Sequence, residues 1–277
     1  MVTINPLDVL LWTLRRNEKD VINLYDSLSP VMQVATGGSM LNFGYWTEKI
    51  KEPILAQKNL CDFFGRFAEL ENAHTAIDVG SGLSAPAIFW RNLYEKLNLN
   101  CVNINYKQLC FSGHEKNIEF INSTSTKLPF ADNSVDRVLA LESSQHFKPL
   151  DGFISESKRI LKKSGILALA LPVTLSHASI RKLGILKFTW SSEHYDVDFI
   201  KKLVVSKGFT ITEQQLIGDH VYAPLSDYYT KNREFLKKSI QQKYPDFVEK
   251  ILFKSMLKMK KAAEEKMIDY LILKCKF

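Results

Sequence analysis

Cysteine is scarce in this sequence, and its scarcity argues against two kinds of scaffold. The 277 residues include four cysteines, Cys61, Cys101, Cys110 and Cys275, which form no CxxC pair and no metal-binding spacing with histidine. A disulfide framework is therefore not indicated, and we expect no bound metal ion. A reducing compartment is the simplest setting for such cysteines, so the sequence predicts a cytoplasmic protein.

Long hydrophobic runs are also missing. The longest run, around GILALALPV at 165–173, is far too short to span a bilayer and is typical of a buried strand. At the N-terminus the basic residues follow a short apolar run, which reverses the order found in a secretory signal. We therefore expect a soluble protein without a transmembrane segment.

Acidic residues are fewer than basic ones. The chain has 37 lysines and arginines against 30 aspartates and glutamates, a net charge of +7, with the excess concentrated in 230–243 and 254–266. Such runs are typical of a solvated helix face, and an anionic substrate or a membrane surface is the alternative interpretation. Nucleic acid is not indicated, because no recognised binding module is present and the aromatic residues do not alternate with the basic ones.

Hydrophobic residues are plentiful, at 45% of the chain, and their spacing indicates the fold class. Short apolar runs alternate with amphipathic stretches, and the predicted strands are TAIDVG, NCVNIN, VDRVLALE and GILALALP. This alternation predicts an α/β fold with a parallel sheet and helices on both faces. Further on, 192–209 predicts a helix that ends at Gly208, and FTITEQQLI and MIDYLILKCKF predict two more strands.

Four segments follow from these patterns. Residues 1–67 are predicted to be a helical segment with an aromatic loop, and 68–219 a ligand-binding core. Residues 220–266 are too long and too helical for a simple connection, so we expect a helical cap inserted before the last strand, 267–277.

The stretch AIDVGSGLSAPA, Ala76 to Ala87, indicates a ligand. Gly80 and Gly82 allow the backbone to turn tightly at a strand end and to approach a ligand closely, with a helix N-terminus behind them. We expect a nucleotide or a nucleotide-like cofactor there. Taken alone, the pattern also fits the dinucleotide fingerprint GxGxxA, so it is weak by itself.

Two neighbouring residues argue against a dehydrogenase. Asp78 precedes the first glycine by two positions, where its carboxylate can reach a cationic amine or order the turn; a pyrophosphate would gain nothing from that charge. Asn103 stands where enzymes that use NAD have an acid for the ribose. An asparagine side chain can still bind ribose hydroxyls, although Asn103 also fits a polar strand end without a ligand.

With these residues the chain resembles a class I S-adenosylmethionine-dependent methyltransferase of the small-molecule group, which includes sterol, tocopherol and natural-product methyltransferases. The resemblance covers most of the chain and rests on an ordered set of motifs: LNFGYW, AIDVGSGLSAPA, VNINYKQL, KLPFADNSVDRVLALESSQHF and FISESKRILKKSGILAL. It continues in weaker form through GFTITEQQLIGDHVYAP to the last strand. The resemblance implies a Rossmann-like sheet of seven strands and S-adenosyl-L-methionine as cofactor.

The resemblance also implies roles for individual residues. The residues implied to bind the cofactor are Tyr45, Trp46, Asp78, Gly80, Gly82, Asn103, Gln108, Thr124, Ser125, Leu128 and Leu141. Within this set, Asp78 and the two glycines would hold the methionine part, Asn103 and Gln108 would lie by the ribose, and Leu128 would flank the adenine.

Three positions depart from the family pattern. Ser84 replaces the usual third glycine, and Asn103 and Thr124 replace residues that are often acidic. At the second of these acidic positions the family usually binds the adenine amine, and here Ser125 or a backbone carbonyl could replace that contact.

The aromatic loop LNFGYW has two interpretations. In relatives it folds over the cofactor and helps to exclude water, which would be the role of Tyr45 and Trp46. Alternatively, Phe43 and Trp46 only fasten the N-terminal helices to the core.

Two residues after the strand VDRVLALE are candidates for catalysis, because open α/β sheets bind ligands at the carboxyl ends of their strands. Glu142 and His146 should therefore lie near the transferred methyl group. Histidine is the residue type best suited to general base catalysis near neutral pH. The structural alternatives are a carboxylate that only binds backbone groups and a histidine that only packs or caps.

These inferences predict a methyltransferase that acts on carbon, nitrogen or oxygen of a small metabolite. The metabolite is expected to be apolar or amphipathic, and an anionic metabolite is the alternative. The departures at Ser84, Asn103 and Thr124 support a second hypothesis, a catalytically silent methyltransferase-like binding protein. The sequence leaves the oligomeric state open.

Overall fold

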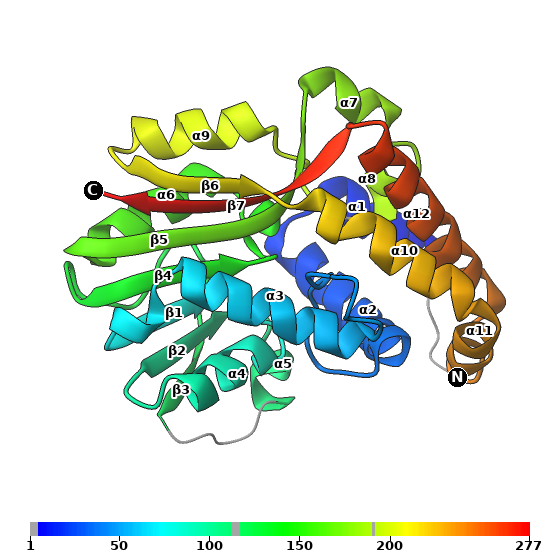
Figure 1. The fold of residues 1–277 in the computed structure, drawn as a ribbon, viewed down its shortest axis with the longest axis horizontal. Coiled ribbons are helices and arrows are strands. Elements are labelled where there is room, and N and C mark those ends of the chain that lie inside the picture. Colours follow the sequence, from blue (N-terminus) through cyan, green and yellow to red (C-terminus); the bar gives the residue numbers. More distant parts are fainter. Residues whose placement is uncertain (1–4, 112–116, 190–191) are drawn as a thin grey trace.

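A computed structural model describes residues 5–111, 117–189 and 192–277, and it contains one sheet of seven strands. The strands are β1 (Thr75–Val79), β2 (Asn98–Asn103), β3 (Ile118–Asn122), β4 (Val135–Leu141), β5 (Leu161–Thr174), β6 (Thr210–Leu216) and β7 (Ile268–Lys276). Their order is β3-β2-β1-β4-β5-β7-β6, and β7 runs antiparallel to both of its neighbours. Figure 1 shows this last strand between β5 and β6.

The sheet confirms the predicted fold class. Each of the six strands expected from the sequence is present, with ends shifted by at most four residues. The seventh, β3, pairs at the edge with β2, and only Ile118 in it is buried, so its hydrophobic signal is weak. The central strands read as continuous apolar runs because helices cover both of their faces.

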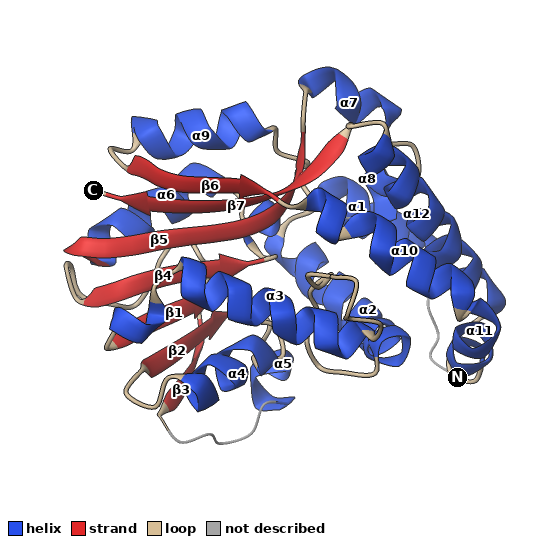
Figure 2. Cartoon of the chain, in the orientation of Figure 1, coloured by secondary structure: helices blue, strands red, loops and turns tan. Residues whose placement is uncertain are grey.

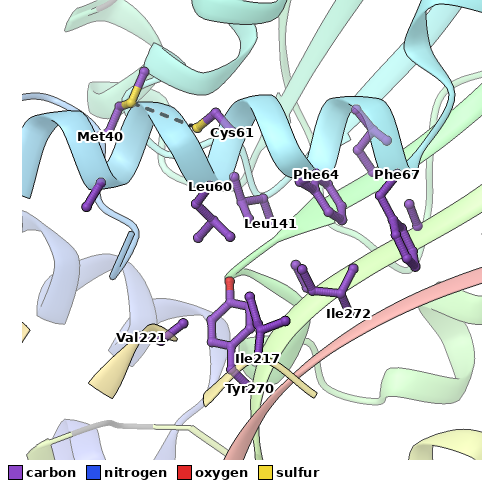
Figure 3. Packing of buried hydrophobic residues seen from close by; sticks show 14 of the residues in the cluster. Met40, Leu60, Cys61, Phe64, Phe67, Leu141, Ile217, Val221, Tyr270 and Ile272 are labelled. Atoms are coloured by element: carbon purple, nitrogen blue, oxygen red, sulfur yellow. Dashed lines mark hydrogen bonds between the residues drawn. The ribbon is translucent and has the colours of Figure 1, made fainter. Parts of the chain in front are cut away.

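Two hydrophobic clusters cover the two faces of the sheet. Helices α3 (Pro53–Phe67) and α4 (Ala85–Leu93) lie over one face, and α6 (Leu150–Ile160) and α9 (Val197–Ser206) over the other, as Figure 2 shows. In β1, Ala76 belongs to the first cluster and Ile77 to the second, since neighbouring strand residues point to opposite faces. Figure 3 shows Leu60, Phe64 and Phe67 of α3 above Tyr270 and Ile272 of β7.

The helix predicted around 192–209 is α9. It starts at the N-cap Asp196, whose side chain accepts a hydrogen bond from Asp198 N–H, and it is followed by Gly208 at φ +83°. That left-handed backbone conformation suits glycine, which explains why the helix ends where the sequence predicts. Two short helices before it, α7 (His177–Lys182) and α8 (Leu186–Thr189), have no counterpart in the sequence prediction.

The short helix α5 (Tyr106–Phe111) packs beside β2 and β3, and five further helices gather at one end of the sheet. Before β1 come α1 (Pro6–Arg15) and α2 (Glu18–Thr36), and between β6 and β7 come α10 (Tyr222–Lys231), α11 (Arg233–Gln241) and α12 (Asp246–Glu264). Figure 1 shows both groups at the right-hand end of the sheet. Segments from the two ends of the chain thus meet beyond the strands, where α11 packs against α2 and α8 packs against α1 and α12.

The basic cap helices are amphipathic rather than apolar throughout. In α12 the buried side includes Met256 and Met259, while Lys261 makes an ion pair on its exposed side. Across the described parts of the chain, no helix combines the length and the apolar character needed to cross a membrane.

Candidate active site

The predicted glycine turn lies between the end of β1 and the start of α4. Gly80 has φ +76° and Gly82 has φ +56°, both in the left-handed region. A Cβ atom on Gly80 would lie 2.5 Å from the Cβ atom of Ser143, which is too close for two side chains. A Cβ atom on Gly82 would meet only Leu41, at 3.7 Å. Gly80 therefore lets the turn lie directly against the segment after β4.

A cavity of about 120 Å³ opens beside this turn. We call it the glycine-turn cavity. Seven of the predicted cofactor-binding residues line it: Gly80, Gly82, Asn103, Gln108, Thr124, Ser125 and Leu141. Glu142 and His146, the two predicted catalytic residues, line it as well. The sheet brings these residues together because β1, β2 and β4 are neighbours and end at the same edge.

Four predicted residues, Tyr45, Trp46, Asp78 and Leu128, do not line this cavity. Trp46 is only 4% exposed and donates its Nε1–H to the backbone oxygen of Phe43 at 3.1 Å. Tyr45 stacks on His220, with ring centroids 4.6 Å apart, and on a phenylalanine of α3. The aromatic loop thus fastens α3 to the segment that precedes α10.

Leu128 is buried in the second hydrophobic cluster, below the segment that carries Thr124 and Ser125. Its backbone N–H donates to Glu156 and its backbone oxygen accepts from Arg159, both on α6. These contacts fix the loop after β3 to the helix beneath it. Leu128 therefore supports the loop rather than facing the cavity.

Asp78 is buried under the glycine turn, 2% exposed. Burial raises the pKa of its carboxyl group to about 7. Asp78 lies two residues after Ala76 in β1, so its side chain points to the same face of the sheet, which α3 and α4 cover. Burial is the main cause that raises the pKa of the thiols of Cys61 and Cys101, and the charge of Asp78 adds to it. A buried acid of this kind is stabilised in its charged form by a nearby cation, and it is costly without one.

Asn103 connects the glycine turn to α2 through a chain of amide and hydroxyl groups. Its Nδ2 donates to Gly82 O at 3.2 Å and to Gln108 Oε1 at 2.9 Å. Gln108 Nε2 in turn donates to Ser29 Oγ on α2 at 3.0 Å. Because both amide groups are held in place, they present fixed polar edges to the cavity.

Thr124 has a carboxylate neighbour that the sequence prediction missed. Its Oγ1 donates to Glu18 Oε1 at 2.5 Å, across 106 residues of sequence. Glu18 is the first residue of α2 and lines the glycine-turn cavity. No local pattern could have identified Glu18, because only the packing of α2 against the sheet edge brings it there.

Glu142 directly follows β4 in a strained conformation. Its φ of +51° is rare for a residue with a side chain, and its N–H donates to Ala170 O at 2.7 Å. Its Oε1 accepts from Phe43 N–H and from the Tyr270 hydroxyl, each at 2.9 Å. Burial raises the pKa of Glu142 to about 8 although both hydrogen bonds act in the opposite direction. At neutral pH this carboxyl group is therefore mostly protonated.

His146 ends a short 3-10 helix, Ser144–His146, and faces α2. Its Nε2 lies 2.7 Å from the hydroxyl of Tyr25, and the two rings meet edge to face at 5.3 Å. Burial is the main cause that raises the pKa of Tyr25, and the charge of Glu142 adds to it. The Tyr25 hydroxyl therefore keeps its proton at neutral pH. The sequence prediction missed Tyr25 because an aromatic residue on an amphipathic helix has no distinguishing local signal.

A second cavity, of about 360 Å³, adjoins the first. Its walls come from α1, α2, α8 and α12, and the apolar side chains there include Val9, Leu10, Leu24, Val31, Met32, Phe188, Phe247, Leu252, Met256 and Met259. We call it the apolar cavity. Four residues line both cavities: Tyr25, Leu41, Glu142 and His146. The predicted catalytic residues thus lie where a polar compartment meets an apolar one.

Among the residues that the structure describes, those that line the apolar cavity include no lysine or arginine. The basic residues of α11 and α12 instead make ion pairs on the outer surface, such as that of Lys260 with Asp227. Within residues 5–111, 117–189 and 192–277, no three His, Cys, Asp or Glu side chains are grouped as a metal site would require.

Comparisons with known proteins agree with this geometry. Residues 77–169 match the family model of the methyltransferase domain. An erythromycin 3''-O-methyltransferase from Saccharopolyspora erythraea is 23% identical over 262 residues, which are 87% of this chain and 86% of that protein.

Two solved structures share the fold. The cyclopropane synthase MmaA2 from Mycobacterium tuberculosis superposes with a TM-score of 0.80 at 16% identity, over 94% of this chain and 98% of that chain. The mycolic acid cyclopropane synthase CmaA1 complexed with SAH and CTAB gives a TM-score of 0.73 at 18% identity, over 100% and 99% of the two chains.

The fold, the glycine turn and these matches define a Rossmann-like methyltransferase. Residues 77–169 form a class I S-adenosylmethionine-dependent methyltransferase domain, and the chain is similar to methyltransferases of sterols and natural products. It shares its fold with the cyclopropane synthase. It is an enzyme of this class, and its cofactor is S-adenosylmethionine. The cavity suits that cofactor, because Asn103, Gln108 and Thr124 line it with polar groups and the buried acid Asp78 lies beneath the turn.

Proposed function

We propose that this enzyme transfers a methyl group to an oxygen or nitrogen atom of a small apolar or amphipathic molecule. The observation that carries the proposal is the junction of the two cavities at Tyr25, Glu142 and His146. A proton-accepting histidine at that junction suits an oxygen or nitrogen acceptor, whose proton must leave as the methyl group is transferred. The similarity to an enzyme that methylates an oxygen of erythromycin supports the same choice of atom.

The glycine-turn cavity is proposed to hold the cofactor. Gly80 and Gly82 would hold its methionine part, with Asp78 balancing the charge of its amino group. Asn103 and Gln108 would bind the ribose hydroxyls through amides that are already fixed. At the adenine end, the lining residues Thr124, Ser125 and Glu18 offer polar groups, and Leu141 is an apolar neighbour.

The apolar cavity is proposed to hold the acceptor. Burying a hydrocarbon surface there is favourable by about 25 cal/mol per Å², whereas an acceptor with a phosphate or carboxylate would be buried without a cationic partner. The cavity lining therefore supports an apolar or amphipathic acceptor over an anionic one. The basic runs at 230–243 and 254–266 fit the first interpretation of their charge, a solvated helix face.

The residues at the junction would act on the acceptor proton. When bound, S-adenosylmethionine would supply a methyl group on a positively charged sulfur. A lone pair of the acceptor would attack that methyl carbon in line, with the sulfur as leaving group. The acceptor's proton passes to the Tyr25 hydroxyl oxygen while the Tyr25 proton passes to His146 Nε2, 2.7 Å away. Tyr25 thus stays neutral and the imidazole carries the added proton. Glu142, anchored by Phe43 and Tyr270, closes the junction as a largely neutral carboxyl group.

A direct test is to incubate the purified protein with S-adenosylmethionine and apolar phenols, alcohols, amines and alkenes. We expect methylated phenols or amines, detected by mass spectrometry, together with an equal amount of S-adenosylhomocysteine. Methylation of the alkenes alone would overturn the choice of oxygen or nitrogen, since an alkene carbon offers no acidic proton to His146.

A further inference from the structure

Gln145 lies between the two predicted catalytic residues and lines the apolar cavity. It belongs to the 3-10 helix after β4 and is only 5% exposed. Its Nε2 donates to the backbone oxygen of Glu142 at 2.7 Å and lies 3.3 Å from His146 Nε2. Because a carbonyl oxygen can only accept, these contacts require the amide nitrogen on that side.

The opposite end of the same amide has no protein partner. Gln145 Oε1 is buried and accepts no hydrogen bond. Within the described residues, other buried side-chain oxygens without a hydrogen bond, such as Gln57 Oε1 and Ser226 Oγ, belong to residues that line neither the glycine-turn cavity nor the apolar cavity. A buried acceptor of this kind is unfavourable unless a ligand or water supplies a donor.

The other hydroxyl side chains around the apolar cavity are already engaged. Thr13 donates to Leu10 O, Thr189 to Ile185 O and Ser255 to Ile251 O, all one helical turn back. Such bonds remove a hydroxyl proton from competition for a ligand. Gln145 Oε1 differs from these hydroxyl oxygens because it is buried and takes part in no hydrogen bond, in a residue that lines a mostly apolar cavity.

We infer that Gln145 Oε1 accepts a hydrogen bond from a second O–H or N–H group of the methyl acceptor, next to the atom that is methylated. The position follows from the 3.3 Å between the amide and His146, which receives the proton in the proposed reaction. The enzyme then selects apolar molecules with two neighbouring donors, such as vicinal diols, catechols or amino alcohols. This inference rests on the proposed function and adds the substrate class.

The test uses two probes, 4-nonylcatechol and 4-nonylphenol, which share an apolar chain and differ by one hydroxyl group next to the first. We expect calorimetry on the protein loaded with S-adenosylhomocysteine to show about 5- to 100-fold tighter binding of the catechol. In Gln145→Leu the catechol should lose this advantage, while the phenol should bind within a few fold of its wild-type affinity. Ser255→Ala is the matched control, since its hydroxyl is already engaged, and it should keep the preference.

The outcomes separate this inference from the proposed function. Equal binding of both probes to the wild-type protein would overturn the role of Gln145, and so would a preference that survives in Gln145→Leu. If the preference is present but neither probe is methylated, the inference stands and the proposed reaction falls. If neither probe binds, the apolar cavity does not hold the acceptor and both proposals fail. The wild-type comparison needs no variant, so misfolding of Gln145→Leu cannot hide the result.

Discussion

At Gly80 the limit on side-chain size comes from the protein itself. Ser143 Cβ lies 2.5 Å from the point where a Cβ atom on this residue would be, and Phe147 Cζ is 3.2 Å from the same point. Gly82 has a similar backbone conformation but open space around it. The two glycines of the same turn therefore make a matched pair for mutation.

We expect Gly80→Ala to abolish detectable binding of S-adenosylhomocysteine, because relieving the contact with Ser143 must displace the turn. Gly82→Ala should cost only about 1 kcal/mol, the usual penalty of a left-handed conformation for an ordinary residue. Calorimetric titration of both folded variants measures their affinity for S-adenosylhomocysteine. Wild-type affinity in Gly80→Ala would show that the turn is not part of the cofactor site.

The pair formed by Tyr25 and His146 tests the proposed base. His146→Ala should lower kcat by about 100- to 10,000-fold, and affinity for S-adenosylhomocysteine should stay near wild type. Tyr25→Phe, which keeps the ring and removes the hydroxyl 2.7 Å from Nε2, should lower kcat as well. Turnover within a few fold of wild type in a folded His146→Ala protein would leave orientation and desolvation as the mechanism.

At the scale of elements, α2 is the wall that both cavities share. It begins with a capping box between Asn17 and Asp20, and it carries Glu18, Tyr25 and Ser29 to the site. Polar contacts connect it to the sheet edge, so substitution of a single side chain can weaken this connection. A helix fixed in this way can couple the filling of one cavity to the shape of the other.

Asp26 makes this coupling testable. Its Oδ1 accepts from Asn105 Nδ2 at 2.7 Å, and its Oδ2 forms an ion pair with the exposed Lys107 at 2.8 Å. We expect Asp26→Ala to weaken binding of S-adenosylhomocysteine by about 1 to 2 kcal/mol, because α2 loses a partly buried contact near the ribose site. Lys107→Ala is the control and should change the affinity little, since an exposed ion pair contributes little. Equal effects of the two variants would contradict a role for α2.

At the scale of the whole molecule, two buried acids should make stability depend on pH. The folded-state pKa is about 7 for Asp78 and about 8 for Glu142, both above the ordinary values of unfolded carboxyl groups. The folded protein therefore binds more protons than the unfolded chain between about pH 4 and pH 8. Over that range its stability falls as pH rises, the reverse of the behaviour of a carboxylate in an ion pair.

We expect the ligand-free protein to be more stable at pH 5.5 than at pH 8.5, by a few kcal/mol at most. Urea unfolding at the two pH values measures the difference. Asp78→Asn and Glu142→Gln should each reduce it, because a neutral amide has no proton to lose. A wild-type protein that is more stable at pH 8.5 would show that neither acid is protonated in the fold.

Cofactor binding should change the protonation of Asp78. If Asp78 balances the amino group of S-adenosylhomocysteine, its pKa falls on binding and a proton is released at pH 6. Calorimetry in buffers with different ionisation enthalpies should then show release of up to about one proton in the wild-type protein and less in Asp78→Asn. Identical proton release from the two proteins would remove Asp78 from the cofactor site.

The sequence by itself determined those features that depend on neighbouring residues. Strands β1, β4, β5 and β7 are dense apolar runs, and Gly80, Gly82 and Gly208 mark positions of positive φ, so most of the sheet, the turn and the end of α9 were predictable. Residues at the ends of neighbouring parallel strands must share one edge, which is why Asn103, Glu142 and His146 were predicted together. Ser84 shows a limit of prediction from residue type. Its φ is +56°, a conformation typical of the glycine that the family has at this position.

Only the tertiary structure decided which side chains face the cavities. Glu18 and Tyr25 reach the site from α2, more than 100 residues away from their partners Thr124 and His146, and helix periodicity says which side of a helix is buried but not against what. Tyr45, Trp46 and Leu128 were predicted at the cofactor and instead line neither cavity, since packing against α3, the cap and α6 determines their direction. The apolar cavity also depends on the fold, because its walls come from both ends of the chain and exist only when α1, α2, α8 and α12 pack together.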